Sequence, residues 1–313
     1  MIDARYIAAA RRTAAGSALC RLFASGEGGR SYLLSSPDAL LCECIALAAA
    51  AAENGGGNAG RRIEEGLCDD VRVFGREGFR TEDADAVVSL CRLAPAELKR
   101  RVFVLLLADS SDAAQNKLLK TLEDAPGRTV FFVAAPASSL LPTVASRLET
   151  IIPDAPSPGK EFEGETGENM PYALYGGSDS LTEFDALLKG EKTDSLRRAI
   201  KLAEIIGPSA RMLECAGLLG QTRRDMRDTL SYFERILGDA TRYHGGVRTE
   251  NYGLFNVRAV AEKFPLAAVP GALKAARSAA ARAATGNLAA IADTFVITVS
   301  EVMYHAKSGG RQV

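Results

Sequence analysis

The chain has 313 residues, of which 47% are hydrophobic and 25% charged, and its net charge is -1. This composition is that of an ordinary globular protein, and it excludes a disordered chain, a collagen-like chain and a uniformly basic nucleic-acid coat. No uninterrupted apolar run of about 18 residues occurs, so the sequence predicts no membrane span. The N-terminus lacks the pattern of a signal peptide, and we expect a cytoplasmic protein.

Charge is unevenly distributed along the chain. Residues 154–190 carry a net charge of -6, whereas residues 191–313 carry +6. A mild basic bias is usually a solvated helical surface, so charge alone does not assign a nucleic-acid role. The six cysteines stand among apolar neighbours without zinc-finger spacing. We therefore expect them to be reduced and buried, with no metal bound.

Short apolar runs alternate with helical patterns in the first half of the chain. Strands are predicted at 32–34, 71–74, 102–107 and 129–134, and helices at 40–52, 81–93 and 110–123. A glycine-rich loop is expected at 54–60, and Thr81 is the expected N-cap of the second helix. Short links between strands and helices predict an α/β fold, with a parallel sheet and helices on both faces.

The second half of the chain reads as helical. Residues 153–177 are rich in proline, glycine and acids, which predicts a linker. Helices are then expected at 181–189, 193–206, 209–219, 221–243, 254–264, 270–285 and 287–305. The predicted organisation is an α/β domain over 1–153, a short acidic linker with a reduced helical domain over 154–207, and an all-α domain over 208–313.

The first strand, turn and helix stand where a phosphate-binding loop belongs. Such a loop needs glycines for close backbone approach, a lysine for the phosphate charge and a hydroxyl for magnesium. Residues 32–46 contain neither glycine nor lysine, and Glu43 adds a negative charge. We therefore expect no nucleotide cofactor.

Asp109 follows the strand 102–107 too late for a magnesium ligand, and we interpret it as the N-cap of the next helix. Both histidines, His244 and His305, lie in the helical half, which disfavours a histidine-based hydrolase.

Two sequence blocks carry a specific resemblance. Ala114–Pro126 (AQNKLLKTLEDAP) and Leu140–Arg147 (LLPTVASR) resemble the AQNALLKTLEEPP and LLPTIxSRC motifs of the AAA+ clamp-loader subunits of bacterial DNA polymerase III. The spacing between the blocks also matches, and the similarity runs over most of residues 15–150. The resemblance implies an AAA+-like N-terminal domain, a short lid domain and a C-terminal helical collar that mediates oligomerisation.

The losses within this family pattern resemble those of the delta-prime type. Cys42 aligns with the phosphate-loop lysine, Glu43 with its threonine and Leu106 with the magnesium-binding acid, whereas Ser146 and Arg147 keep the SR pair. The resemblance implies a degenerate nucleotide site that does not hydrolyse ATP. It also implies that Arg147, with Ser146 in the same motif, is exposed and acts in trans as an arginine finger. The alternative for Arg147 is a structural arginine at a helix C-terminus.

The resemblance further implies the partners of the chain. These are the gamma/tau ATPase and delta subunits, the sliding clamp indirectly, and primer–template DNA within the complex, without a membrane. The family's four zinc cysteines are absent, so no zinc is expected. The isolated chain is not expected to be an enzyme, although the DNA polymerase III holoenzyme is a nucleotidyltransferase. Two alternatives remain: an active AAA+ ATPase with a divergent phosphate loop, and an AAA-like interaction module outside replication.

Overall fold

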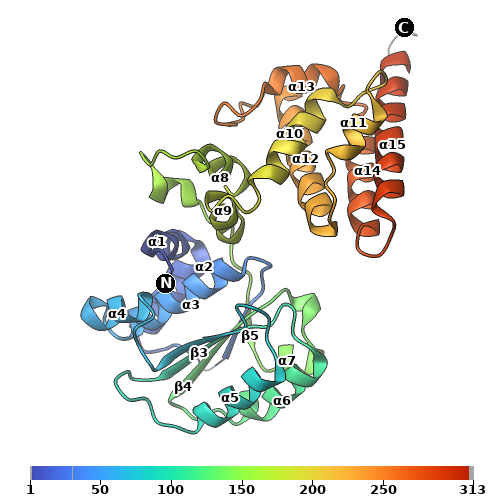
Figure 1. Cartoon of the computed structure of the whole chain (residues 1–313). Helices are drawn as coiled ribbons and strands as arrows, with labels where there is room; N and C mark the ends of the chain where they lie inside the picture. The colour runs from blue at the N-terminus through green and yellow to red at the C-terminus, as the bar shows by residue number, and fades with distance from the viewer. Residues whose placement is uncertain (1, 30, 310–313) are drawn as a thin grey trace. The chain divides into compact units, whose positions relative to one another are not determined.

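The structure is a computed structural model that describes residues 2–29 and 31–309 (Figure 1). Its contacts group into two compact units. The first unit comprises Met1–Gly164 together with Ser178–Glu183, and the second comprises Glu165–Gly177 together with Phe184–Val313. The division into three domains, at 1–153, 154–207 and 208–313, stays a prediction.

A five-stranded parallel sheet forms the centre of the first unit. Its strands are β1 (Ser31–Leu34), β2 (Val71–Phe74), β3 (Arg101–Leu106), β4 (Thr129–Ala134) and β5 (Glu149–Ile151). They are ordered β2-β3-β4-β1-β5, and each pairs in parallel with its neighbours. Every residue of β3 and β4 is buried, as expected for central strands covered on both faces.

Helices cover both faces of this sheet (Figure 1). One layer contains α1 (Ala4–Arg12), α2 (Ala14–Ala24), α3 (Ala39–Glu53) and α4 (Gly57–Glu64), and α3 packs on β3 and β4. The other contains α5 (Thr81–Cys91), α6 (Asp112–Glu123) and the short α7 (Pro142–Ala145). Leu118 and Leu122 of α6 join Phe103 and Phe131 of the sheet in one apolar core. The predicted α/β class with helices on both faces is confirmed. Two 3-10 helices complete the unit, η1 (Ala137–Ser139) and η2 (Pro158–Phe162).

Three local predictions in this unit are wrong. The loop expected at 54–60 ends early, because Gly55–Gly57 make the turn with positive φ and α4 begins at Gly57. Asp109 is exposed and caps no helix; Ser111 caps α6, its hydroxyl accepting a hydrogen bond from the amide of Ala114. Thr81 is already helical, and Arg80 is the N-cap residue of α5.

The second unit is helical. Its helices are α8 (Met170–Gly176), α9 (Leu181–Leu188), α10 (Thr193–Ile205), α11 (Met212–Gly217), α12 (Arg223–His244), α13 (Val257–Lys263), α14 (Val269–Arg282) and α15 (Leu288–Gly309). The first residues of α9, up to Glu183, belong to the first unit. The helical second half is confirmed, while α8 replaces part of the predicted linker. Phe233 of α12 packs edge-on against Phe264 and Phe295, with ring centroids 6.0 and 5.6 Å away.

The last helix, α15, is long and apolar enough over Leu288–Ser308 to cross a membrane by length and composition alone. Core helices pass the same test. This helix carries Asp293 and Glu301, and its Phe295, Val299 and Met303 are buried inside the unit.

Candidate functional site

The carboxyl ends of β1 and β4 mark the place where a ligand is expected in this sheet. The chain leaves β1 into α3 on one face, and it leaves β4 toward α7 on the other face. Open α/β sheets bind ligands in the crevice outside such a switch point, where the first helix also offers amide groups to an anion. The contacts at this edge of the sheet therefore decide whether it can hold a nucleotide.

The anion position at the start of α3 is taken by the carboxylate of Asp38. This residue is the N-cap of α3, and its Oδ1 accepts a hydrogen bond of 3.0 Å from the amide of Leu41. Its side chain is buried, with 6% of the residue exposed. A carboxylate at a helix N-terminus is stabilised by the helix dipole and by the free amides there. The negative charge that a phosphate would bring is thus already present in the chain.

The same carboxylate also caps the start of α9. Its Oδ2 accepts from the amide of Leu181 at 2.7 Å, and its Oδ1 accepts from the amide and hydroxyl of Thr182 at 3.1 and 2.7 Å. The Thr182 hydroxyl in turn accepts from the amide of Leu40 at 3.1 Å. The amides of Leu40 and Leu41 are therefore paired within the protein, and a phosphate on these two groups would have to displace both Asp38 and Thr182.

Three residues that the sequence resemblance places at nucleotide-binding positions are also unsuited to a nucleotide. Cys42 is buried and donates to the carbonyl of Leu34 at 3.6 Å, and burial raises the pKa of its thiol. Glu43 is buried and forms an ion pair with Arg76, whose pKa is raised by this hydrogen bond. Leu106 is a buried apolar residue at the end of β3. None of these positions supplies a positive charge for a phosphate, and the carboxylate oxygens of Glu43 are already bound by Arg76.

Arg147 follows α7 and is held by its own chain. Its Nη1 donates to the carbonyl of Thr143 at 2.7 Å, and its Nη2 lies 3.0 Å from Oε2 of Glu123. Its side chain is 31% exposed, so the arginine is partly rather than fully exposed. The reason is that Glu123, from the other motif, draws the guanidinium onto α6. Ser146 is exposed, and its hydroxyl donates to the same Thr143 carbonyl at 3.2 Å.

Gln115 of the first motif positions the second motif, a role that the sequence analysis missed. The residue is buried, and its Oε1 accepts from the amide of Leu141 at 2.8 Å while its Nε2 donates to the carbonyl of Ser139 at 3.0 Å. This pair of bonds fixes the backbone that enters α7, and hence the backbone position from which the Arg147 side chain extends. A glutamine between alanine and asparagine at the start of a helix carries no local signal for such a contact, because its partners lie 24 and 26 residues away.

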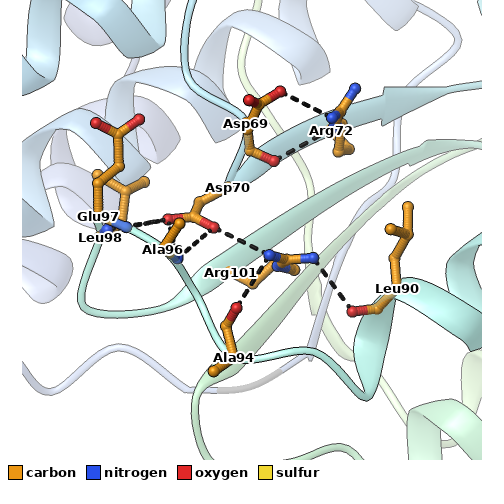
Figure 2. Close-up of polar contacts among 9 residues, drawn as sticks. All are labelled: Asp69, Asp70, Arg72, Leu90, Ala94, Ala96, Glu97, Leu98 and Arg101. Atoms are coloured by element: carbon orange, nitrogen blue, oxygen red, sulfur yellow. Dashed lines mark hydrogen bonds and ion pairs between the residues drawn. The ribbon is translucent and has the colours of Figure 1, made fainter.

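A second polar cluster lies at the opposite, amino-terminal end of β3 (Figure 2). The carboxylate of Asp70 is fully buried and accepts from the amides of Ala96, Glu97 and Leu98 at 2.8–3.0 Å. Its Oδ1 also lies 3.1 Å from Nη2 of Arg101. Burial raises the pKa of Asp70, but the three amides and the guanidinium outweigh burial and hold it below the usual value.

The buried Arg101 completes this cluster. Its guanidinium donates to the carbonyls of Leu90 and Ala94 at 3.3 and 3.1 Å (Figure 2). Asp70 and Arg101 together hold the segment that connects α5 to β3, so the cluster is a structural device rather than an exposed site. Among residues 2–29 and 31–309, no group of three or more histidine, cysteine, aspartate or glutamate side chains is placed to hold a metal ion.

A family model matches most of the first unit. Residues 16–153 match the model of a family described as DNA polymerase III, delta subunit, and the match covers less than half of the chain. Among solved structures, a DNA polymerase III gamma subunit-related protein from Thermotoga maritima is similar, at 14% identity and a TM-score of 0.49. That likeness covers 92% of this chain and 99% of the other. No curated protein matches the chain.

Proposed function

We propose that this chain is a clamp-loader subunit of the DNA polymerase III type, of the delta-prime kind, that does not hydrolyse ATP. In this proposal it works in the cytoplasm within a hetero-oligomer of gamma/tau and delta subunits, which opens the sliding clamp and loads it at primer–template DNA. Residues 208–313 serve as its collar. The family match over residues 16–153 supports the assignment to such a complex.

The single observation that carries the non-hydrolysing role is the internal carboxylate at the start of α3. Asp38 accepts hydrogen bonds from the amides of Leu41, Leu181 and Thr182, so an internal carboxylate occupies the helix terminus that would bind phosphate. A second carboxylate, Glu43, stands where a hydroxyl is needed and is itself paired. These contacts disfavour the alternative of an active ATPase with a divergent phosphate loop.

Arg147 has the role of an arginine finger in this proposal. An arginine offered by a neighbouring subunit stabilises the charge that develops on the transferred phosphoryl group, an effect of about 10³–10⁵ in rate in comparable systems. The contacts with Thr143 and Glu123 leave N–H groups on both terminal nitrogens of the guanidinium for an incoming phosphate. Gln115 supports this role by fixing the backbone at Leu141.

Assembly is the first expected result of this proposal. The tagged chain, co-expressed with the gamma/tau and delta subunits of its own organism, is expected to purify with both in one complex on size-exclusion chromatography. Salt screens the attraction between exposed charges, so an association through surface charge alone should dissociate at moderate salt. The specific complex should persist. A chain that purifies alone under these conditions would favour the interaction module outside replication.

A second expected result is that the isolated chain does not respond to ATP. With ATP and magnesium at about 100 times a micromolar dissociation constant, a true ligand would add about 2.7 kcal/mol to the free energy of unfolding. We expect no such rise in the melting temperature of this chain, because the amides of Leu40 and Leu41 at the start of α3 are already paired. The gamma/tau subunit, measured in the same buffer, is the positive control. A rise of several degrees in the melting temperature of this chain with ATP would contradict the assignment of a degenerate nucleotide site.

A further inference from the structure

The surface of the second unit has a pocket that plays no part in the proposed role of Arg147. The loop from Gly245 to Asn256, which connects α12 to α13, borders this open pocket, whose volume is about 720 Å³. Tyr243 and Phe255 supply aromatic walls, and Arg248 and Arg258 supply guanidinium groups. This volume far exceeds what a single phosphate ion needs and is typical of pockets for nucleotide-sized ligands.

The loop is built by its own side chains. Asn251 donates to the carbonyl of Phe255 and accepts from the amide of Gly253, while Asn256 caps α13 through the amide of Ala259 at 3.1 Å. Tyr252 is held at a positive φ of 51°. A residue other than glycine at positive φ costs conformational free energy, and such strained residues concentrate at ligand-binding loops. The pocket is therefore a defined feature of the loop.

Both charged residues that line the pocket are arginines. Arg248 is exposed and forms no hydrogen bond or ion pair with any residue that the structure describes. Arg258 lies on the first turn of α13 and is paired through Nε with Glu262 at 2.7 Å, which leaves its terminal nitrogens available. Two arginines with free N–H groups match phosphate oxygens, because a guanidinium can bind two of them at once.

The aromatic residues narrow the kind of anion. The side chain of Tyr243 is a wall of the pocket, and 42% of the residue is exposed. Exposed rings beside arginines are the pattern of sites that stack unpaired bases while binding the phosphates between them. Bases inside a duplex cannot enter such a pocket, and an acidic peptide makes no use of the rings.

We propose that this pocket binds a short segment of single-stranded nucleic acid, with phosphates on Arg248 and Arg258 and a base against Tyr243. The inference rests on the second unit alone and does not depend on the fate of the nucleotide site or of Arg147.

Fluorescence anisotropy of the full chain with a labelled oligothymidylate tests this proposal. Arg248→Ala is expected to weaken binding about tenfold at low salt and to reduce the slope of log K against log salt by about 0.7, the loss of one phosphate contact. Tyr243→Leu is expected to weaken binding roughly tenfold with an unchanged slope, while Tyr243→Phe keeps the affinity because the stacking face remains. Arg227→Ala removes an exposed arginine elsewhere on α12 and should change neither quantity.

Each other outcome of this experiment overturns the proposal. No binding by the wild-type chain excludes the site. Equal weakening by Arg248→Ala and Arg227→Ala shows general attraction to a basic surface, and full competition by polyglutamate or equal affinity for a duplex shows that no base is recognised. Circular dichroism melting of each variant identifies a change in affinity that is due to unfolding.

Discussion

Replacement of Arg147 by alanine is expected to lower the DNA-stimulated ATPase rate of a reconstituted clamp-loader complex while leaving its assembly intact. The loss at the single site facing Arg147 should reach about 10³-fold or more, because an arginine finger stabilises the transition state of phosphoryl transfer. The measured loss for the whole complex should be partial, since its other interfaces keep their own arginines. Steady-state ATPase measurements with wild-type gamma/tau and delta subunits give this value directly.

Matched variants separate a catalytic role of Arg147 from a structural one. Arg147→Lys should recover little activity, because an ammonium cannot bridge two phosphate oxygens. Arg128→Ala removes an exposed arginine of the same unit and should leave the rate unchanged. The ion pair with Glu123 is partly exposed, so its loss should cost less than about 1 kcal/mol of stability. If the assembled Arg147→Ala complex hydrolyses ATP at the wild-type rate, Arg147 has only a structural role.

Asp70→Asn is expected to destabilise the first unit by about 3–5 kcal/mol at neutral pH, the cost of leaving a buried charge without its partner. The substitution keeps the size of the side chain but leaves the buried guanidinium of Arg101 without its counter-charge. It also weakens the bonds from the three amides of Ala96–Leu98. Since whole domains are stable by only about 5–15 kcal/mol, the urea unfolding midpoint of this unit should fall steeply.

The neighbouring Asp69 provides the control for this variant. Asp69 pairs with Arg72 at 2.8 Å, but its side chain is 87% exposed (Figure 2). Asp69→Asn should therefore change the free energy of unfolding by less than about 1 kcal/mol. Equal effects of the two substitutions would contradict the role assigned to the buried pair.

The effect of Asp70 should also depend on pH with a definite sign. Its pKa in the folded protein is lowered, so its charged form stabilises the fold. This contribution is fully present above the unfolded-state pKa of about 3.9 and is lost as the pH falls through the lower folded-state pKa. The difference in unfolding free energy between the wild type and Asp70→Asn should therefore be constant near neutral pH and shrink in acid.

The sequence predicts the central strands well, but it predicts their end residues and the short elements less well. The apolar run at 129–134 is β4 itself, and the run at 102–107 is β3 displaced by one residue, because β3 begins at Arg101. A charged residue at the start of a buried strand is possible only because Asp70 neutralises it from 31 residues away. The short β5 and the helix α8 have too few residues to produce a periodic pattern, and both were missed.

The candidate site shows the same limit of local patterns. The absence of glycine and lysine before α3 predicts that a phosphate loop is lost, but it does not predict what replaces the phosphate. The replacement depends on Thr182, which meets Asp38 from 144 residues away. Likewise, each of the two family motifs is visible in the sequence, whereas the bond between Glu123 and Arg147 that joins them exists only in the fold.

The carboxylate of Asp38 has a consequence for timing. A subunit that binds ATP passes through empty, ATP-bound and ADP-bound states, and the populations of these states follow the ratio of ATP to ADP in the cell. A ligand that is part of the chain cannot be exchanged or hydrolysed, so the start of α3 has one occupied state whatever the cell's energy supply. In the proposed complex, this subunit would therefore keep one state at the start of α3 while its ATP-binding neighbours pass through several.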